Sequence, residues 1–194
     1  MRITADFAGV PIGVGLSYDS YRKFFEAQQT EAAPAASVIV GEVDRRRAAE
    51  FYPAGSTDAY IEYMELCRRV SDVMIPFRRT VFHGCAFLWR GRVVLLCAPS
   101  GTGKTTHYVR WKQLCGDEIQ ILNGDKPVLF ARQEGDVTVH PSPWHGKEGM
   151  GQPISAPLGG IVFLRKAAEK YDPDLIIFGH THIPYTDYKG KATL

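Results

Sequence analysis

Residues 98–106 read Ala-Pro-Ser-Gly-Thr-Gly-Lys-Thr-Thr and follow the apolar run Val-Val-Leu-Leu at residues 93–96. Glycines at this spacing, between a strand and the start of a helix, let a phosphate approach consecutive backbone amides at the positive end of the helix. The lysine places a point charge at the β- and γ-phosphates, and the hydroxyl after it can ligate the magnesium that bridges them. We therefore interpret residues 97–106 as a phosphate-binding loop (P-loop) for ATP or ADP with Mg²⁺.

Each position of this loop has an expected role. The nucleotide contacts are assigned to Ser100, Gly101, Thr102, Gly103, Lys104, Thr105 and Thr106. Lys104 is also a candidate catalytic residue, and Thr105 a candidate magnesium ligand. Ala98 stands where the general motif has its first glycine, so the entry turn must use a backbone conformation open to alanine. The alternative is a glycine-rich turn with an accidental lysine.

A carboxylate follows the next predicted strand. Asp125 comes after Gly124, where its side chain can ligate magnesium or accept a proton from a nucleophilic hydroxyl. The alternative is a turn aspartate ahead of Lys126 and Pro127. We treat Asp125 as a candidate catalytic residue and metal ligand.

Three segments in this order resemble the catalytic domain of HPr kinase/phosphorylase, which shares its nucleotide-binding core with phosphoenolpyruvate carboxykinase. They are Phe-His-Gly-Cys-Ala at residues 82–86, the loop at residues 99–106, and Leu-Asn-Gly-Asp-Lys-Pro-Val at residues 122–128. The resemblance implies ATP- and magnesium-dependent phosphoryl transfer to a hydroxyl, on a protein or peptide serine or a small molecule. It also implies that His83 lies beside the reacting phosphate. The alternative is a structural histidine in the core, whose ring nitrogens have hydrogen-bond partners within the protein.

The sequence departs from this family at one catalytic position. The family has two adjacent carboxylates where this chain has Gly124 and Asp125. A nucleotide-binding module without transferase activity is therefore the second hypothesis.

Residues 142–149, Ser-Pro-Trp-His-Gly-Lys-Glu-Gly, are similar to a glycine-hinged active-site loop of uncharacterised kinase-like relatives. On that interpretation Lys147 could clamp a transferring phosphoryl group. The alternative is an exposed connection in which Trp144 packs on the core and Lys147 is solvated.

Residues 174–184 resemble the last metal-binding motif of calcineurin-like metallophosphoesterases. There His180 and His182 follow an apolar run, and two imidazoles at this spacing can ligate a transition metal, although two ligands alone make a weak site. The D-x-H and N-H-D segments that supply other metal ligands in that family are missing from the sequence, and Asn-Gly-Asp at residues 123–125 is not that signature. We interpret the chain as a chimera, in which a strand of the metallophosphoesterase family is joined to a kinase-like core near residues 168–172. The third functional hypothesis is a metal-dependent phosphoesterase fragment.

The hydrophobic pattern predicts an α/β fold with a mixed, strand-rich sheet around the P-loop, as in the HPr kinase and phosphoenolpyruvate carboxykinase core. Helices are expected at residues 18–29, 57–70 and 104–114, and strands at residues 38–43, 80–89, 92–97, 119–122, 128–132, 137–140, 160–164 and 175–178. Ser17 is the expected cap of the first helix, and Ser56 or Thr57 that of the second. We divide the chain into an N-terminal α+β segment (1–72), a kinase-like core (73–168) and a metallophosphoesterase-like tail (169–194).

The composition limits which classes of binding partner and which cellular location are expected. With 23 Lys and Arg against 21 Asp and Glu, the net charge of +2 gives no reason to expect a nucleic-acid partner, and residues 45–47, all arginine, are expected on a solvated helix face. The four cysteines are too widely spaced for a C-x-x-C pair, so buried reduced thiols and a cytoplasmic location are expected. No stretch has the length of a membrane span, so we predict no membrane association. The expected partners are the nucleotide, a hydroxyl acceptor and a second copy of the chain in a homo-oligomer.

Overall fold

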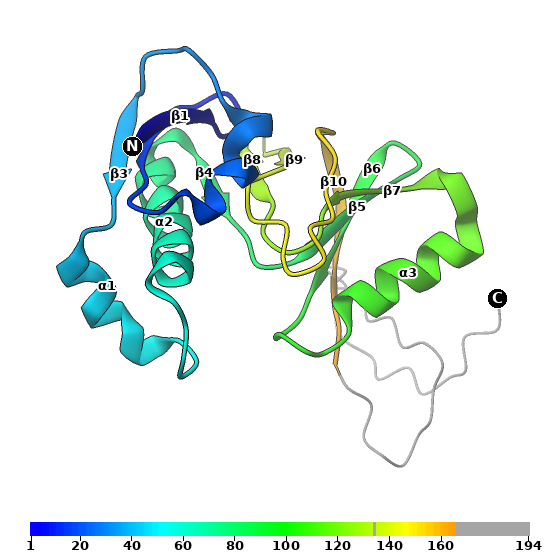
Figure 1. The fold of residues 1–194 in the computed structure, drawn as a ribbon. Helices are drawn as coiled ribbons and strands as arrows, with labels where there is room; N and C mark the ends of the chain where they lie inside the picture. Colours follow the sequence, from blue (N-terminus) through cyan, green and yellow to red (C-terminus); the bar gives the residue numbers. More distant parts are fainter. Residues whose placement is uncertain (134, 166–194) are drawn as a thin grey trace.

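The computed structural model describes residues 1–133 and 135–165. They form a mixed α/β structure with two sheets, one in the strand order β1-β2-β3 and a curled one in the order β4-β8-β9-β10-β6-β5-β7 (Figure 1). The strands are β1 (Arg2–Asp6), β2 (Pro11–Gly15), β3 (Ala36–Ile39), β4 (Arg79–Val81), β5 (Cys85–Trp89), β6 (Arg92–Cys97), β7 (Ile119–Asn123), β8 (Val128–Ala131), β9 (Val137–His140) and β10 (Ala156–Phe163). The α-helices are α1 (Glu42–Ala48), α2 (Asp58–Met74) and α3 (Lys104–Cys115), and the 3-10 segments are η1 (Asp19–Gln28), η2 (Ala49–Phe51), η3 (Ile75–Phe77) and η4 (Gly116–Glu118).

The smaller sheet and α2 enclose the first core. Helix α2 is amphipathic, with Ile61, Leu66, Val70 and Met74 on its buried face. Thr57 caps it, because its Oγ1 accepts a hydrogen bond from Tyr60 N at 3.2 Å, as the sequence predicted. This core also includes Val128 and Trp144, from the second half of the chain.

Two sequence predictions for the N-terminal part are corrected. The strand expected at residues 38–43 is shorter (Ala36–Ile39), because Gly41 begins α1 and its N–H bonds to Asp44 Oδ2 at 2.9 Å. The helix expected at residues 18–29 is the 3-10 segment η1, and Ser17 does not cap it. Ser17 N instead donates to the carboxylate of Glu62 at 3.0 Å. Contacts distant in sequence therefore override the local pattern.

The arginines of α1 divide between solvent and core. Arg46 and Arg47 are exposed, as predicted, but Arg45 is buried and its Nη1 lies 3.6 Å from Glu62 Oε1. Glu62 is itself only 1% exposed and also accepts hydrogen bonds from two backbone amides. The solvated face predicted for all three is wrong for Arg45, because a buried carboxylate needs a cation and hydrogen-bond donors close to it.

The central strands form the second core. Strand β6 pairs antiparallel with β5 and parallel with β10, and β10 also pairs antiparallel with β9, so it joins the two halves of the larger sheet. Helix α3 covers one face, where Trp111 packs against Phe87 and Trp89 with ring centroids 5.4 and 5.0 Å apart. The predicted strand at residues 92–97 and helix at residues 104–114 are confirmed, but the run at residues 80–89 forms two strands, β4 and β5.

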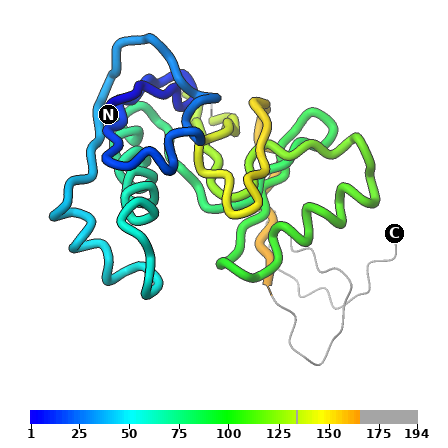
Figure 2. The backbone as a smooth tube through the Cα atoms, in the orientation of Figure 1, coloured from blue at the N-terminus to red at the C-terminus, as the bar shows by residue number. Residues whose placement is uncertain are grey.

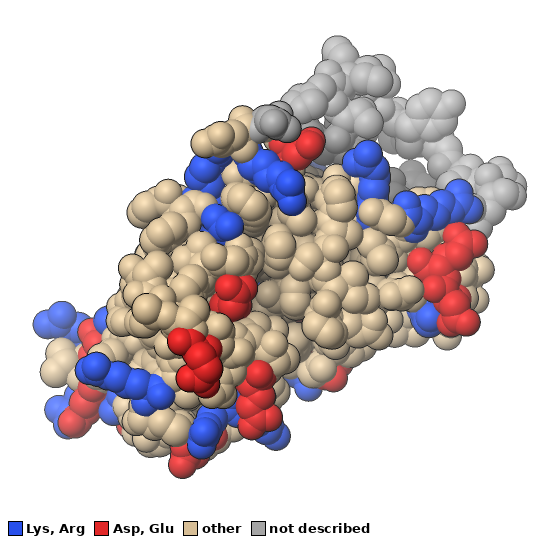
Figure 3. Space-filling model, turned by 90° about the horizontal axis from the view of Figure 1, so that it is seen from above, with Lys and Arg blue, Asp and Glu red and all other residues tan. Residues whose placement is uncertain are grey.

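The described surface carries charges of both signs. On the face seen in Figure 3, Lys, Arg, Asp and Glu are intermixed, and a broad uncharged area lies between the two ends. All four cysteines are free thiols; Cys67 and Cys85 are buried, and Cys97 and Cys115 are half-buried. Across residues 1–133 and 135–165, no helix has the length and apolar character needed to span a membrane.

Candidate active site

The glycine-rich loop joins β6 to α3. Gly101 and Gly103 have φ values of 76° and 105°, a left-handed backbone that side-chain-bearing residues rarely adopt. Gly103 is the N-cap of α3, and its carbonyl accepts the first helical hydrogen bond from His107 N at 2.9 Å. Ala98 is buried and its φ is not positive, so alanine fits the entry turn without strain. The two glycines are thus required by the backbone that leads into the positive end of α3.

Lys104 is folded back over this loop. It is 8% exposed, and its Nζ donates to Ala98 O at 2.9 Å and to Pro99 O at 3.5 Å. The same nitrogen lies 3.2 Å from His83 Nε2. The ammonium group is therefore held at the loop by neutral oxygens and an imidazole.

His83 and Asp125 are brought together by the larger sheet. Phe82 N donates to Pro127 O at 2.9 Å and Gly84 N donates to Asp125 O at 2.8 Å, which connects the β4–β8 and β5–β7 ladders across the site. His83 Nε2 consequently lies 3.3 Å from Asp125 Oδ1. The side chains of residues 83, 104 and 125, predicted separately from the sequence, form one cluster.

The charge of Asp125 is set by its neighbours. Burial raises the pKa of this carboxyl group, but hydrogen bonds from His83 and from Lys126, whose Nζ binds Oδ2, outweigh burial and lower the pKa to about 2. Asp125 is therefore ionised throughout the physiological pH range.

Asn123 holds the site together, a role that the sequence did not reveal. Its side chain is buried, and its Oδ1 accepts hydrogen bonds from the backbone amides of Asp125 (3.0 Å) and Lys126 (2.8 Å). Its Nδ2 donates to Ser142 O at 3.1 Å. An asparagine that bonds to the amides two and three residues later is a local turn signal. The bond to Ser142 crosses 19 residues and has no local signal.

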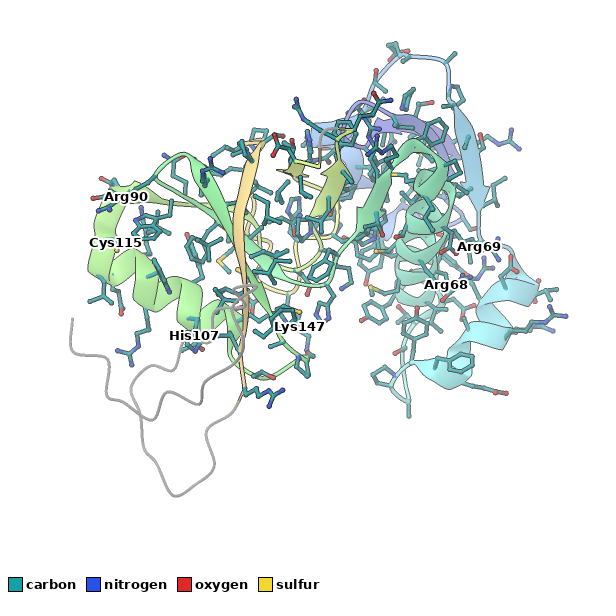
Figure 4. All side chains as sticks on the ribbon, turned by 180° about the vertical axis from the view of Figure 1, so that it is seen from behind. Arg68, Arg69, Arg90, His107, Cys115 and Lys147 are labelled. Carbon is teal, nitrogen blue, oxygen red and sulfur yellow. The ribbon has the colours of Figure 1, made fainter. Side chains whose placement is uncertain are left out.

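The loop at residues 142–149 is anchored at one end and exposed at the other. Trp144 is 1% exposed; its Nε1 donates to Tyr63 O at 3.0 Å, and Tyr63 Oη donates to Pro143 O at 2.8 Å. In the chain trace of Figure 2 this loop lies between the N-terminal part and the central strands. Lys147 is exposed, at the same end of the central sheet as His107 (Figure 4). Trp144 thus packs on the core, as expected if residues 142–149 form a connection between strands.

Gly124, where the resembled family has a carboxylate, has no space for a side chain. A Cβ at this position would lie 2.8 Å from His145 O and 3.2 Å from Met150 O. Gly124 N also donates to Met150 O at 2.9 Å, so the two segments are held in close contact. The first carboxylate of the family pattern is therefore incompatible with this backbone arrangement.

Replacing Gly124 by aspartate is expected to destabilise the protein, not to restore a second carboxylate. Overpacking of this kind lowers the free energy of unfolding by about 1–3 kcal/mol. Urea unfolding measures the effect, with Gly160→Asp as the control, because nothing lies within 4 Å of a Cβ at Gly160. Equal stability of the two variants would contradict the packing described for Gly124.

The other predicted site residues are placed as follows. Ser100, Gly101 and Thr102 lie on the loop, Thr105 is half-buried in the first turn of α3, and Thr106 is exposed one position further. His180 and His182, and the strand expected at residues 175–178, lie outside the described residues.

A separate hollow of about 520 Å³ lies between α1 and α2, away from the loop. Arg68 and Arg69 line it, on the opposite side of the molecule from His107 (Figure 4). Both arginines already pair with carboxylates: Arg69 with Asp44 at 2.7 Å and Arg68 with Glu65 at 3.0 Å. The described residues that were predicted as catalytic or nucleotide-binding lie at or beside the glycine-rich loop and do not line this hollow.

Comparison of the sequence with protein-family models gave no match, and comparison with curated proteins gave none either.

Proposed function

We propose that this chain binds ATP or ADP with Mg²⁺ at the glycine-rich loop and transfers a phosphoryl group to a hydroxyl acceptor, in the manner of the HPr kinase/phosphorylase family. The observation that carries the proposal is the convergence of Lys104, His83 and Asp125 at the start of α3. His83 Nε2 lies 3.2 Å from Lys104 Nζ and 3.3 Å from Asp125 Oδ1. A helix start, a buried lysine and an ionised carboxylate are the parts that phosphoryl transfer uses.

Lys104 is the expected partner of the phosphate oxygens. Its present acceptors are the backbone carbonyls of Ala98 and Pro99, which belong to the loop itself. A phosphate at the loop offers charged acceptors, and hydrogen bonds between charged groups are about twice as strong as neutral ones. The lysine can therefore exchange the carbonyls for the phosphate with a small movement of its ammonium group.

The residues present fit magnesium as part of a nucleotide complex. Thr105 offers a hydroxyl and Asp125 a carboxylate, and Mg²⁺ prefers such oxygen ligands, usually one or two carboxylates together with substrate phosphates and water. Within residues 1–133 and 135–165 no three His, Cys, Asp or Glu side chains are grouped so as to hold a metal ion. Bound magnesium would neutralise phosphate charge, with the nucleotide completing its ligands.

The low pKa of Asp125 favours one of its two expected roles. An efficient general base has a pKa near the working pH, and a carboxyl group with a pKa of about 2 is far from it. An ionised, oriented carboxylate is what a metal ligand requires. We therefore assign Asp125 to magnesium, with His83 orienting it through the 3.3 Å contact.

A nucleotide-binding module without transferase activity is the second candidate. The observation that favours it is the tight packing of Gly124, which excludes the first carboxylate of the family pattern. Acceptor-dependent formation of ADP distinguishes the two functions.

The test is to incubate the protein with ATP and Mg²⁺ in the presence of serine-containing peptides and small hydroxyl compounds, and to measure ADP. Acceptor-dependent ADP that disappears without Mg²⁺ supports phosphoryl transfer. Nucleotide binding without ADP formation across the acceptors supports the binding module, and absence of nucleotide binding rejects both.

A further inference from the structure

A second carboxylate borders Asp125 from the loop at residues 142–149. The loop turns at Gly146 and Gly149, which have φ values of 79° and 60°, and Gly149 N donates to Gly146 O at 3.2 Å. This turn carries Lys147 and Glu148, and the Glu148 carboxylate lies close to Gly146, which packs against Asp125. Both side chains come from the exposed end of a loop whose other end is anchored in the core.

The space above Gly146 separates the two carboxyl groups. A Cβ at Gly146 would lie 2.9 Å from Asp125 Cβ, 3.5 Å from Asp125 Cγ and 3.7 Å from Glu148 Oε2. One small region is therefore close to both carboxyl groups, and the missing side chain of Gly146 leaves it open. A side chain at position 146 would occupy part of this region and crowd Asp125.

The charges around Cys85 agree with this arrangement. Burial is the main cause that raises the pKa of the Cys85 thiol, to about 12; the charge of Lys104 lowers the pKa, and the charges of Asp125 and Glu148 raise it. The buried thiol of Cys85 is thus close enough to Lys104, Asp125 and Glu148 for their charges to act on it. Glu148 belongs to the same electrostatic environment as Lys104 and Asp125.

Glu148 is free to take a ligand. It is exposed, and its carboxylate makes no hydrogen bond or ion pair with the described part of the chain. Both oxygens of Asp125, in contrast, already have partners in His83 and Lys126. A divalent cation that approaches Asp125 would therefore find in Glu148 an anionic oxygen donor with no competing partner among the described residues.

We propose that Glu148 is the second carboxylate of this site, directed from the loop toward the divalent cation of the bound metal–nucleotide complex. It supplies the negative charge that position 124 cannot carry, because Gly124 is packed against His145 and Met150. The inference rests on the proposed nucleotide function, since the nucleotide phosphates provide the remaining ligands.

The test measures metal binding without catalysis. Mn²⁺ replaces Mg²⁺ as the probe, and free Mn²⁺ is followed by electron paramagnetic resonance during titration of the full chain with ADP present. Glu148→Gln is expected to weaken Mn²⁺ binding in the ADP complex about 10-fold or more, the size found when groups that support a metal are removed. Affinity for ADP in the absence of metal is expected to stay the same.

Glu50→Gln is the matched control, because Glu50 is exposed on η2 and makes no hydrogen bond or ion pair with the described residues. It should bind Mn²⁺ and ADP like the native chain, and thermal unfolding should show both variants folded. Unchanged Mn²⁺ affinity in Glu148→Gln, with the native chain binding Mn²⁺ and ADP, would overturn the role of Glu148 and leave the nucleotide site standing. A native chain that binds ADP neither with nor without Mn²⁺ would overturn both.

Discussion

Replacing Lys104 by alanine is expected to weaken ATP and ADP binding about 100-fold or more. Loss of one partner from a desolvated, hydrogen-bonded charge pair costs about 2–5 kcal/mol, and each 1.4 kcal/mol is a factor of ten in affinity. Lys104 is buried at the loop, so a phosphate bound there would be shielded from water on the lysine side. Other side chains of the cluster cannot replace it, because Lys126 is already paired with Asp125.

Isothermal titration calorimetry of ADP and ATP, with and without Mg²⁺, measures this effect. Lys112→Ala is the matched control, since Lys112 lies near the far end of α3 and its Nζ pairs with Asp117 at 3.1 Å. Because Lys104 also bonds to loop carbonyls, thermal unfolding without nucleotide must show that the variant is folded, and Lys104→Met supplies a bulkier apolar replacement. Equal nucleotide affinity of the Lys104 variants and the native chain would reject the loop as the nucleotide site.

The elements around the loop were predictable because their signals are local. Strand β6 is an unbroken apolar run in the interior of the sheet, and α3 begins where the glycines end. Likewise the cap of α2 is a threonine directly before an apolar stripe. In each case the residues that determine the structure lie within a few positions of it, so the sequence pattern is sufficient.

The predictions that were wrong concern features determined by contacts between residues far apart in the sequence. The run at residues 80–89 forms two strands, because β4 pairs with β8 whereas β5 pairs with β6 and β7 in another part of the sheet. Arg45 is buried because Glu62, 17 positions later in the numbering, lies in the core beside it. Neither contact has a periodic signal, and apolar periodicity alone predicts a longer strand and a solvated arginine.

The site itself was partly predictable. Motif positions identified His83, Lys104 and Asp125, and the sheet ladders bring these three together. Asn123 was read only as part of a motif, because its bond to Ser142 depends on a loop that returns from 19 residues away. The supporting contacts of a site therefore require the fold, even where its charged residues can be named from spacing.

Replacing Trp144 by alanine is expected to lower the free energy of unfolding by about 3–5 kcal/mol, the usual cost of truncating a buried aromatic side chain. Its ring stacks on Phe7 at 5.7 Å between centroids and meets Phe25 edge-on at 5.6 Å. The variant would also lose the hydrogen bond from Nε1 to Tyr63 O. Domain stabilities are commonly 5–15 kcal/mol, so this single change removes a large share.

Urea unfolding monitored by circular dichroism measures this loss, and Trp144→Phe separates its two causes. Phenylalanine retains most of the ring packing but not the N–H donor, so a loss of about 1–3 kcal/mol is expected from the unpaired Tyr63 carbonyl and the smaller ring. A loss below about 1 kcal/mol for Trp144→Ala would contradict the buried position of this side chain.

The same substitution tests whether the N-terminal part of the chain positions the candidate active site. Trp144 is followed directly by His145 and Gly146, the residues that pack against Gly124 and Asp125. If the anchor holds this loop in place, Trp144→Ala should weaken nucleotide–metal binding even where the variant remains folded, because Glu148 would no longer be held near Asp125. Native metal affinity in a folded Trp144→Ala variant would show that the loop keeps its position without the anchor, through its other bonds, such as Asn123 Nδ2 to Ser142 O and Gly124 N to Met150 O.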